Sequence, residues 1–284
     1  MNDYQNIFRR IEKKYILTQE QYLSFRKVIS DFTIEDDYGN TPILNIYYDR
    51  PDFYLIHKSM EKPMYKEKLR LRCYGIPGKN SSSFVEIKKK CENIVYKRRV
   101  CMPYEAALTY LNNPGYPQKR LPHSHNTNEQ ILREIDFMKL RYTPLLPKMT
   151  ICYDRIALMG IDDPNLRITF DKNIRWRSDH LDLRNGNSGT YILPPDYYLM
   201  EIKIVNSIPL TLSRILSRYS IFSTSFSKYG YGYLAYETEK SSNSPARQRA
   251  DNFLKEKSHS ISKTFTIPLP QKQYKLSLNS MSAH

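Results

Sequence analysis

The chain has 284 residues, of which 40% are apolar, so it is long enough and apolar enough to bury the core of one or two globular domains. Its 44 Lys and Arg residues outnumber 29 Asp and Glu residues, and the formal net charge of +15 attracts polyanions without specifying which. The sequence contains no apolar run that could span a bilayer, and the N-terminal stretch MNDYQNIFRRIEKKY lacks the apolar core of a secretion signal. The four cysteines have neither CxxC nor zinc-site spacing, so we expect reduced thiols and a cytoplasmic protein.

The N-terminal part alternates charged and apolar residues, which predicts a first strand over residues 9–17. In this strand Arg10, Glu12 and Lys14 share one face. Thr18-x-x-Gln21 is a capping-box pattern, so a helix follows, and its apolar stripe consists of Tyr22, Phe25, Ile29 and Phe32. Residues 44–53 then predict a second strand, which is stopped by Pro51.

The run from Lys66 to Arg99 carries the most informative pattern, because three successive strands each place cations on one face. In the first strand Lys68, Arg70 and Arg72 oppose Leu69 and Leu71. In the second, Glu86, Lys88 and Lys90 oppose Val85, Ile87 and Lys89; the third adds either Lys97 and Arg99 or Tyr96 and Arg98. Stacked files of cations require an anion between them, and we expect a polyphosphate or a nucleoside triphosphate.

The second half of the chain continues with helices and strands. Helices are predicted over 102–111, 128–142 and 209–222, and strands over 148–160, 166–177 and 198–205, with a polar loop over 112–126. Residues 225–236 close the ordered part. The chain therefore divides into a folded domain, residues 1–236, and a polar Ser/Lys-rich tail, residues 237–284, which we expect to be poorly ordered apart from a loose helix near 250–257.

Seven or eight strands with one charged and one apolar file each predict an α+β fold, in which a closed antiparallel β-barrel has helices packed outside. Inward charges would ordinarily be costly, because a buried ion destabilises a protein by several kcal/mol unless it is compensated. A wide, wet lumen that holds phosphate and metal removes this objection.

Nine segments in register resemble the VTC domain, the catalytic domain of the vacuolar transporter chaperone polyphosphate polymerase and of stand-alone bacterial relatives. They are RRIEKKYIL, YYDRPDF, KLRLRCYG, FVEIKKK, YKRRV, YDRIA, LRITFD, MEIKI and SFSKYG, and the resemblance covers about residues 7–236. It implies membership of the triphosphate tunnel metalloenzymes, the CYTH-like superfamily. Their closed barrel encloses a tunnel that binds triphosphate or polyphosphate with a divalent metal.

The resemblance also implies roles for individual residues. The catalytic cations correspond to Arg70, Arg72, Lys88, Arg155 and Arg167. Further phosphate-binding residues correspond to Lys14, Lys97, Arg99, Lys203, Ser227 and Lys228. Glu201 corresponds to the metal ligand, with Glu12 or Glu86 as an assisting carboxylate or as an ion-pair partner of neighbouring lysines, and the metal is Mn²⁺ or Mg²⁺.

Two positions depart from related patterns. Ser225 stands where the yeast enzyme has a basic residue, which leaves the grip on part of the polymer open. CYTH-type enzymes usually begin with E-x-E-x-K, and Arg10 stands at the first glutamate position. A cation there weakens metal binding and favours a longer anion. We expect a stand-alone domain without the SPX domain and transmembrane segments of the eukaryotic complex, and its association with a membrane-protein partner stays open.

The predicted activity is a metal-dependent phosphotransferase, a polyphosphate polymerase. It moves the γ-phosphoryl group of ATP to the end of a growing inorganic polyphosphate chain and releases ADP. The ligands would be ATP and polyphosphate, with no specific nucleic acid, because nucleic-acid binding would need an exposed basic face with aromatic platforms. Two alternatives remain: a triphosphatase or nucleotide cyclase of the same fold, and a non-catalytic polyphosphate-binding module.

Overall fold

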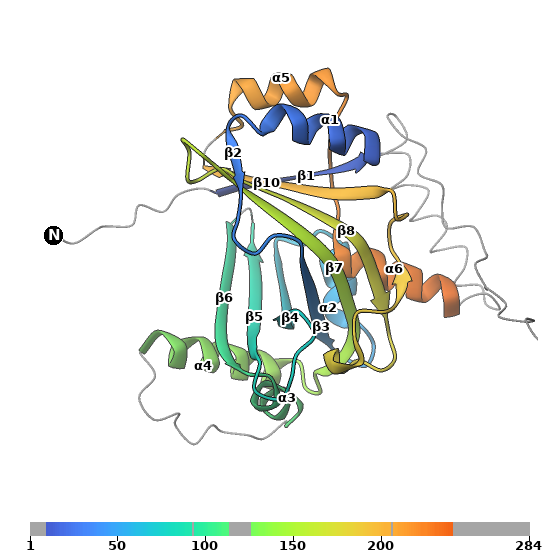
Figure 1. The fold of residues 1–284 in the computed structure, drawn as a ribbon. Coiled ribbons are helices and arrows are strands. Elements are labelled where there is room, and N and C mark those ends of the chain that lie inside the picture. The colour runs from blue at the N-terminus through green and yellow to red at the C-terminus, as the bar shows by residue number, and fades with distance from the viewer. Residues whose placement is uncertain (1–9, 93, 114–125, 206, 241–284) are drawn as a thin grey trace, which may run out of the picture.

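A computed structural model describes residues 10–92, 94–113, 126–205 and 207–240. One antiparallel sheet contains all the described strands, in the order β11-β1-β10-β8-β7-β3-β4-β5-β6, with β2 and β9 pairing to β7 and β8 (Figure 1). The strands are β1 (Arg10–Thr18), β2 (Thr33–Glu35), β3 (Thr41–Asp49), β4 (Tyr65–Tyr74), β5 (Ser82–Cys91), β6 (Ile94–Pro103), β7 (Leu146–Gly160), β8 (Arg167–Arg177), β9 (Thr190–Tyr191), β10 (Tyr197–Val205) and β11 (Ser223–Thr224). The helices are α1 (Gln19–Ile29), α2 (Tyr54–Met60), α3 (Tyr104–Asn112), α4 (Asn126–Arg141), the 3₁₀ turn η1 (Leu183–Asn185), α5 (Leu210–Arg218) and α6 (Lys228–Lys240).

The sheet is strongly curved, and β1 and β10 cross over the end of the β4–β6 layer (Figure 1). Lys14 of β1 is close enough to lower the pKa of Lys68 on β4, although five strand-to-strand steps separate the two strands in the sheet. Among the described residues no pairing joins β6 to β11 or β1, so the predicted antiparallel sheet with outer helices is confirmed but its closure by hydrogen bonds is not seen. The edge strand β11 has only two residues.

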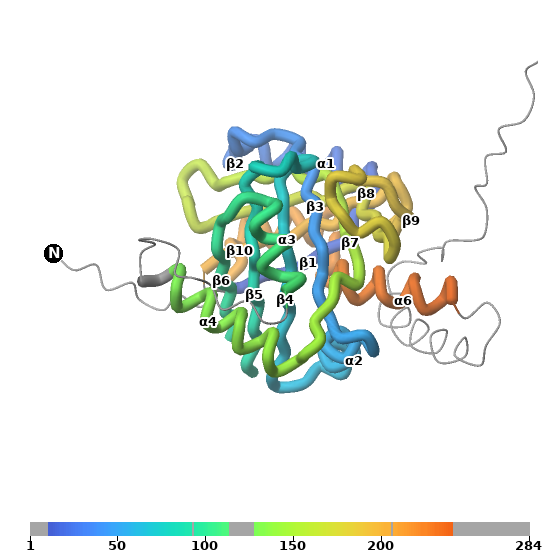
Figure 2. Tube along the Cα trace, turned by 90° about the horizontal axis from the view of Figure 1, so that it is seen from below, coloured from blue at the N-terminus to red at the C-terminus, as the bar shows by residue number. Residues whose placement is uncertain are grey.

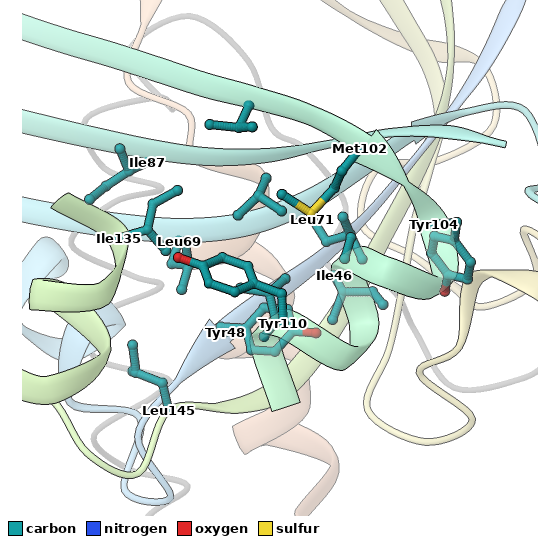
Figure 3. Packing of buried hydrophobic residues seen from close by; sticks show 14 of the residues in the cluster. Ile46, Tyr48, Leu69, Leu71, Ile87, Met102, Tyr104, Tyr110, Ile135 and Leu145 are labelled. Atoms are coloured by element: carbon teal, nitrogen blue, oxygen red, sulfur yellow. The ribbon is translucent and has the colours of Figure 1, made fainter. Parts of the chain in front are cut away.

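Two groups of helices cover the outer face of the sheet, one on each half. Helices α3 and α4 lie across β4, β5 and β6 (Figure 2), where Leu69, Leu71 and Ile87 pack against Tyr110 and Ile135 (Figure 3). The apolar residues that alternate with the cations of the 66–99 run therefore point into this core, as the pattern predicted.

On the other half of the sheet, α1 and α5 cover β1 and β10 (Figure 1), and Phe25 and Leu212 belong to the same core as Met200 and Ile202. The predicted capping box begins α1. Gln21 N donates to Thr18 Oγ1 at 3.2 Å, and Thr18 N donates to Gln21 Oε1 at 3.1 Å.

Helix α6 packs on the inner face of the sheet, where a third core joins its tyrosines to Met149, Ile151 and Trp176. Gly232 permits this contact, because a Cβ at that position would lie 2.8 Å from Met149 Sδ and 2.9 Å from Ile151 Cδ1. The start of α6 thereby reaches the charged part of the inner face.

Eight long strands match the predicted number, whereas the short strands β2, β9 and β11 and the helix α2 were not predicted. Helix α6 continues through Lys240, four residues past the predicted boundary at residue 236. Within the described parts of the chain, none of the helices combines the length and apolar character needed to cross a membrane. Residues 114–125 of the loop predicted over 112–126, the first nine residues and the tail from residue 241 lie outside the described residues.

Candidate functional site

The inner face of the sheet and the start of α6 gather charged side chains from strands that are far apart in sequence. Register places them on one face, since directly paired residues of neighbouring strands point the same way. Cations outnumber carboxylates among them: Lys14, Lys66, Lys68, Arg70, Arg72, Lys88, Lys90, Lys97, Arg99, Arg155, Lys203 and Lys228 lie with Glu12, Glu86, Asp171 and Glu201.

The first group of contacts centres on two carboxylates, Asp171 of β8 and Glu201 of β10. Arg155 donates two hydrogen bonds to Asp171, with distances of 2.6 and 2.8 Å. Lys228 Nζ lies 2.5 Å from Asp171 Oδ2 and 3.1 Å from Glu201 Oε1, and Lys203 Nζ lies 3.3 Å from Glu201 Oε2. Helix α6 thus contributes its first residue to a pair of buried carboxylates.

These contacts decide which groups are charged. Burial opposes ionisation of Glu201, but Lys228, Lys203 and Arg155 outweigh it and hold the pKa of this carboxyl well below its usual range. Burial likewise opposes ionisation of Asp171, and Arg155 and Lys228 lower its pKa. Both carboxylates are therefore ionised at neutral pH and fix the positions of the cations around them.

The second group of contacts centres on Glu86 of β5, of which only 1% is exposed. Arg70 Nη2 lies 2.5 Å and Lys97 Nζ 3.1 Å from its oxygens, while Arg72 Nε lies 4.0 Å away. Burial raises the pKa of Glu86, but Arg70, Arg72 and Lys97 outweigh it and bring the value to about 2. Arg72 is held further by Asn45 Oδ1 at 2.8 Å and by the Tyr153 hydroxyl at 2.9 Å.

A row of three lysines runs across neighbouring strands, and its last member, Lys97, is the one that pairs with Glu86. Lys68, Lys88 and Lys97 are direct partners across β4, β5 and β6, and like charges in such pairs are destabilising. Burial, followed by the charges of Lys88, Lys14, Lys66 and Arg70, lowers the pKa of Lys68 to about 7. Its Nζ donates to the hydroxyl of the predicted phosphate-binding serine, Ser227 Oγ, at 3.1 Å, and Gly230 N donates to the same oxygen at 3.1 Å.

The remaining predicted residues lie at different distances from this centre. Lys14 contacts Glu12 at 3.4 Å and donates to the Phe226 carbonyl at 2.9 Å, so it belongs to the inner face. Arg99 is exposed and lies over the Phe84 ring at 4.7 Å. Arg167 is at the rim, where its guanidinium is 3.3 Å from Asp36 and 49% of its side chain is exposed.

The carboxylates offer limited room for a metal ion. Within the described residues there is no group of three or more His, Cys, Asp or Glu side chains that could hold a metal. Glu12 and Glu201 are diagonal neighbours on one face. Burial and the charge of Glu201 oppose ionisation of Glu12, but Lys88, Lys14 and Lys203 outweigh them and lower its pKa. Mg²⁺ needs only one or two protein carboxylates when phosphate oxygens and water complete its shell, so this pair fits a metal that arrives with a phosphate ligand.

Two residues that the structure places at the centre of this charged face were given no role in the predicted site. Lys68 was placed in the cationic file but given no role, and Asp171 was placed on the face of Arg167 and Thr169 without one. The alternation of β8 could have indicated Asp171. It places this carboxylate on the face that carries cations, so Asp171 has to face the cations of the neighbouring strands. The interior pairing of Lys68 with Ser227, 159 residues apart in sequence, could not be read from local alternation.

The geometry defines a domain made of one curved antiparallel sheet with a cation-rich inner face. The family model of the VTC domain matches residues 9–236, which is most of the chain. The protein therefore belongs to the VTC domain family, as the nine motifs indicated.

The chain is also similar, at low sequence identity, to a curated protein and to solved structures. The chain is 25% identical over 228 residues to vacuolar transporter chaperone complex subunit 4 of Trypanosoma cruzi (strain CL Brener), covering 68% of this chain and 28% of that protein. Among solved structures, a putative adenylate cyclase from Vibrio parahaemolyticus has a TM-score of 0.39 at 13% identity, covering 80% of this chain and 98% of the other. A putative adenylyl cyclase from Hippeastrum, described as having a dominant triphosphatase activity, has a TM-score of 0.47 at 13% identity, covering 80% and 96%.

Proposed function

We propose that the inner face binds ATP and linear polyphosphate and transfers the γ-phosphoryl group of ATP to the end of the polyphosphate chain. The observation that carries this proposal is the excess of cations over carboxylates, above all the lysine row of Lys68, Lys88 and Lys97. Neighbouring cations that share one face need a ligand with many negative charges in a line. Membership of the VTC domain family supports polyphosphate as that ligand.

Phosphoryl transfer requires positioning and charge stabilisation more than covalent help from the protein. Arg70 and Arg72 offer planar donor groups that match phosphate oxygens, and Glu86 holds both in place before a ligand arrives. Arg155 and Lys228 are ordered in the same way by Asp171. The attacking group is already an anionic phosphate oxygen, so the reaction does not call for a strong general base.

A divalent metal, Mn²⁺ or Mg²⁺, completes the proposal. Glu201, with Glu12 beside it, would supply its protein ligands, and the metal would neutralise charge on the reacting phosphates. Glu201 is occupied by Lys203 and Lys228, so these lysines would have to exchange the carboxylate for phosphate oxygens when metal and ligand bind.

The test is a product analysis with purified protein, ATP and either Mn²⁺ or Mg²⁺. We expect long polyphosphate and ADP, lost in Arg70→Ala and Glu201→Gln and retained in Arg98→Ala. Arg98 is the matched control because it lies on the same strand as Lys97 but pairs with Glu134 on the outer face, at 2.7 Å. Orthophosphate without polymer would contradict the polymerase and favour a triphosphatase, and cyclic AMP would favour a cyclase.

A non-catalytic polyphosphate-binding module is the second candidate. The same ordered cations favour it, because binding needs the cation excess but not the Glu201–Glu12 pair. Tight polyphosphate binding without turnover under either metal would select this function over the polymerase.

A further inference from the structure

Asn45 is a completely buried residue of β3, the strand that lies between β7 and β4 in the sheet. Its Oδ1 accepts a hydrogen bond from Arg72 Nε at 2.8 Å, and its Nδ2 donates to the main-chain carbonyl of Ile151 at 2.9 Å. A carbonyl oxygen can only accept, so the contact with Ile151 determines which end of the amide faces Arg72. Asn45 therefore presents a hydrogen-bond acceptor to the Arg72 guanidinium in a fixed orientation.

The charge of Arg72 is less compensated by a neighbouring acid than the charges of Arg70 and Arg155. Arg70 Nη2 lies 2.5 Å from Glu86, and Arg155 Nε lies 2.6 Å from Asp171. Arg72 Nε lies 4.0 Å from Glu86, which is beyond hydrogen-bond distance. Only 6% of the Arg72 side chain is exposed, so water screens its charge poorly. Of these three guanidiniums, that of Arg72 is therefore the least neutralised and attracts a further anion most strongly.

Neutral groups provide the direct hydrogen bonds of Arg72. Besides Asn45 Oδ1, the hydroxyl of Tyr153 accepts from Arg72 Nη2 at 2.9 Å. These two contacts use Nε and Nη2, so Nη1 of the same guanidinium is left for a phosphate oxygen. A carboxylate at position 45 would also hold the guanidinium, but it would neutralise the charge. A neutral acceptor fixes the orientation of Arg72 and preserves its attraction for phosphate.

We propose that Asn45 is a positioning residue, which orients Arg72 toward a bound phosphate and leaves the charge of Arg72 available to that phosphate. The inference rests on the proposed function of the inner face. It adds a residue that acts through Arg72 rather than on the ligand, because the amide of Asn45 is buried and both of its ends are occupied by protein groups.

The experiment compares Asn45→Asp and Asn45→Ala with the wild type in binding inorganic tripolyphosphate, measured by calorimetry at fixed pH and ionic strength. Asn45→Asp keeps the acceptor for Arg72 Nε but adds a compensating charge, so we expect the affinity to fall by about tenfold or more. Asn45→Ala leaves the charge of Arg72 and removes the acceptor, so we expect a smaller loss, of about threefold. A merely structural role would give the opposite order, because Asn45→Asp preserves the contact with Arg72.

The matched control is Asn112→Asp, which makes the same amide-to-carboxylate change at an exposed position. Asn112 is the last residue of α3, on the outer side of the sheet, and its Oδ1 accepts from the Tyr48 hydroxyl at 3.5 Å. This control should bind tripolyphosphate like the wild type. Denaturant unfolding of each variant establishes that it is folded. If Asn45→Asp does not fold, Asn45→Ala decides alone, and an unchanged affinity in it would overturn the positioning role.

The possible outcomes separate the two claims. A loss in Asn45→Ala that equals or exceeds the loss in Asn45→Asp, or no loss in either, would overturn the positioning role and leave the proposed function standing. A control that weakens binding as much as Asn45→Asp would show that only net charge matters and would also overturn the positioning role. A wild type that does not bind tripolyphosphate would overturn the proposed function itself.

Discussion

Asp171 is the most completely buried carboxylate of the inner face, and it holds Arg155 and Lys228 at once. A single buried acid of this kind fixes two cations that come from different elements, the strand β7 and the helix α6. If the Asp171 carboxylate is removed, two buried cations lose a neighbouring negative charge, and the stability of the fold decreases.

We therefore predict that Asp171→Asn lowers the free energy of unfolding by about 3 kcal/mol, because breaking a buried ion pair leaves an uncompensated charge. Urea unfolding monitored by fluorescence measures the change. The control is Glu61→Gln, which removes an exposed partner of Lys58 and should lower stability by less than about 1 kcal/mol. Similar small losses for both variants would show that the Asp171 contacts contribute little.

Lys68 gives the site a dependence on pH. Its pKa of about 7 in the free protein results from burial and from the facing charges of Lys88, Lys14, Lys66 and Arg70. A bound polyanion raises that pKa, so binding takes up a proton when the pH is above 7. Affinity for tripolyphosphate should therefore be highest below pH 7 and fall as the pH rises from 7 to 9, by up to about tenfold per unit for one linked proton.

The variant Lys68→Gln should lose this part of the pH dependence and keep the part that comes from the ligand and from Lys97. Burial and the charges of Arg70 and Arg72 lower the pKa of Lys97 to about 8, although Glu86 opposes this shift. Calorimetric titrations in two buffers of different ionisation enthalpy count the protons taken up. Proton uptake at pH 8 that is the same in the variant and in the wild type would refute this assignment.

At the scale of elements, α6 has two functions in one segment. Its aromatic side chains complete the third core on β7 and β8, and its first residue completes the Asp171–Glu201 group. The position of Lys228 therefore depends on how closely the following turn of the helix approaches the sheet, which Gly232 determines.

We predict that Gly232→Val lowers the free energy of unfolding by about 1–3 kcal/mol, because the larger side chain clashes with Met149 and Ile151 and pushes α6 away from the sheet. Gly232→Ala is the control. Its smaller side chain meets only the flexible ends of those residues, and the gain in helix propensity, about 1 kcal/mol, offsets the crowding. Equal stability of the valine and alanine variants in urea would contradict the close-packing argument.

The elements also show where reading the sequence succeeded and where it failed. Alternation in β4 and β5 correctly assigned Leu69 and Ile87 to the outer core and Arg70 and Lys88 to the other face, since the period of a strand is a local property. The helix α2 was missed because its N-cap residue, Phe53, provides no side-chain cap. Asp49, earlier in the chain, accepts instead from Leu55 N at 2.8 Å and Ile56 N at 3.0 Å. The placement of α6 on the inner face depends on tertiary packing that no local pattern encodes.

At the scale of the whole molecule, the net charge of +15 is partly gathered on one face, where cations outnumber carboxylates. Mutual repulsion on that face opposes folding as long as it has no ligand. A polyanion that binds only the folded state relieves the repulsion and stabilises the protein by mass action.

Accordingly, tripolyphosphate at about 100 times its dissociation constant should stabilise the fold by about 2.7 kcal/mol and raise the melting temperature by several degrees. The effect should largely disappear in about 1 M salt, where the Debye length is about 3 Å. Thermal unfolding with sodium sulfate at matched ionic strength is the control, because sulfate also strengthens burial by exclusion. An equal rise with sulfate would refute specific stabilisation.

The two-faced strands have a consequence for how the chain finds its fold. If β4 paired with β5 one residue out of step, Lys68, Arg70 and Arg72 would be driven beneath α3 and α4, and Leu69 and Leu71 would be left against water. Such a misaligned ladder would lose its apolar burial and bury several unpaired cations, so it lies far above the native pairing in free energy. The same alternation that prepares the inner face for an anion thus also selects one alignment of the strands during folding.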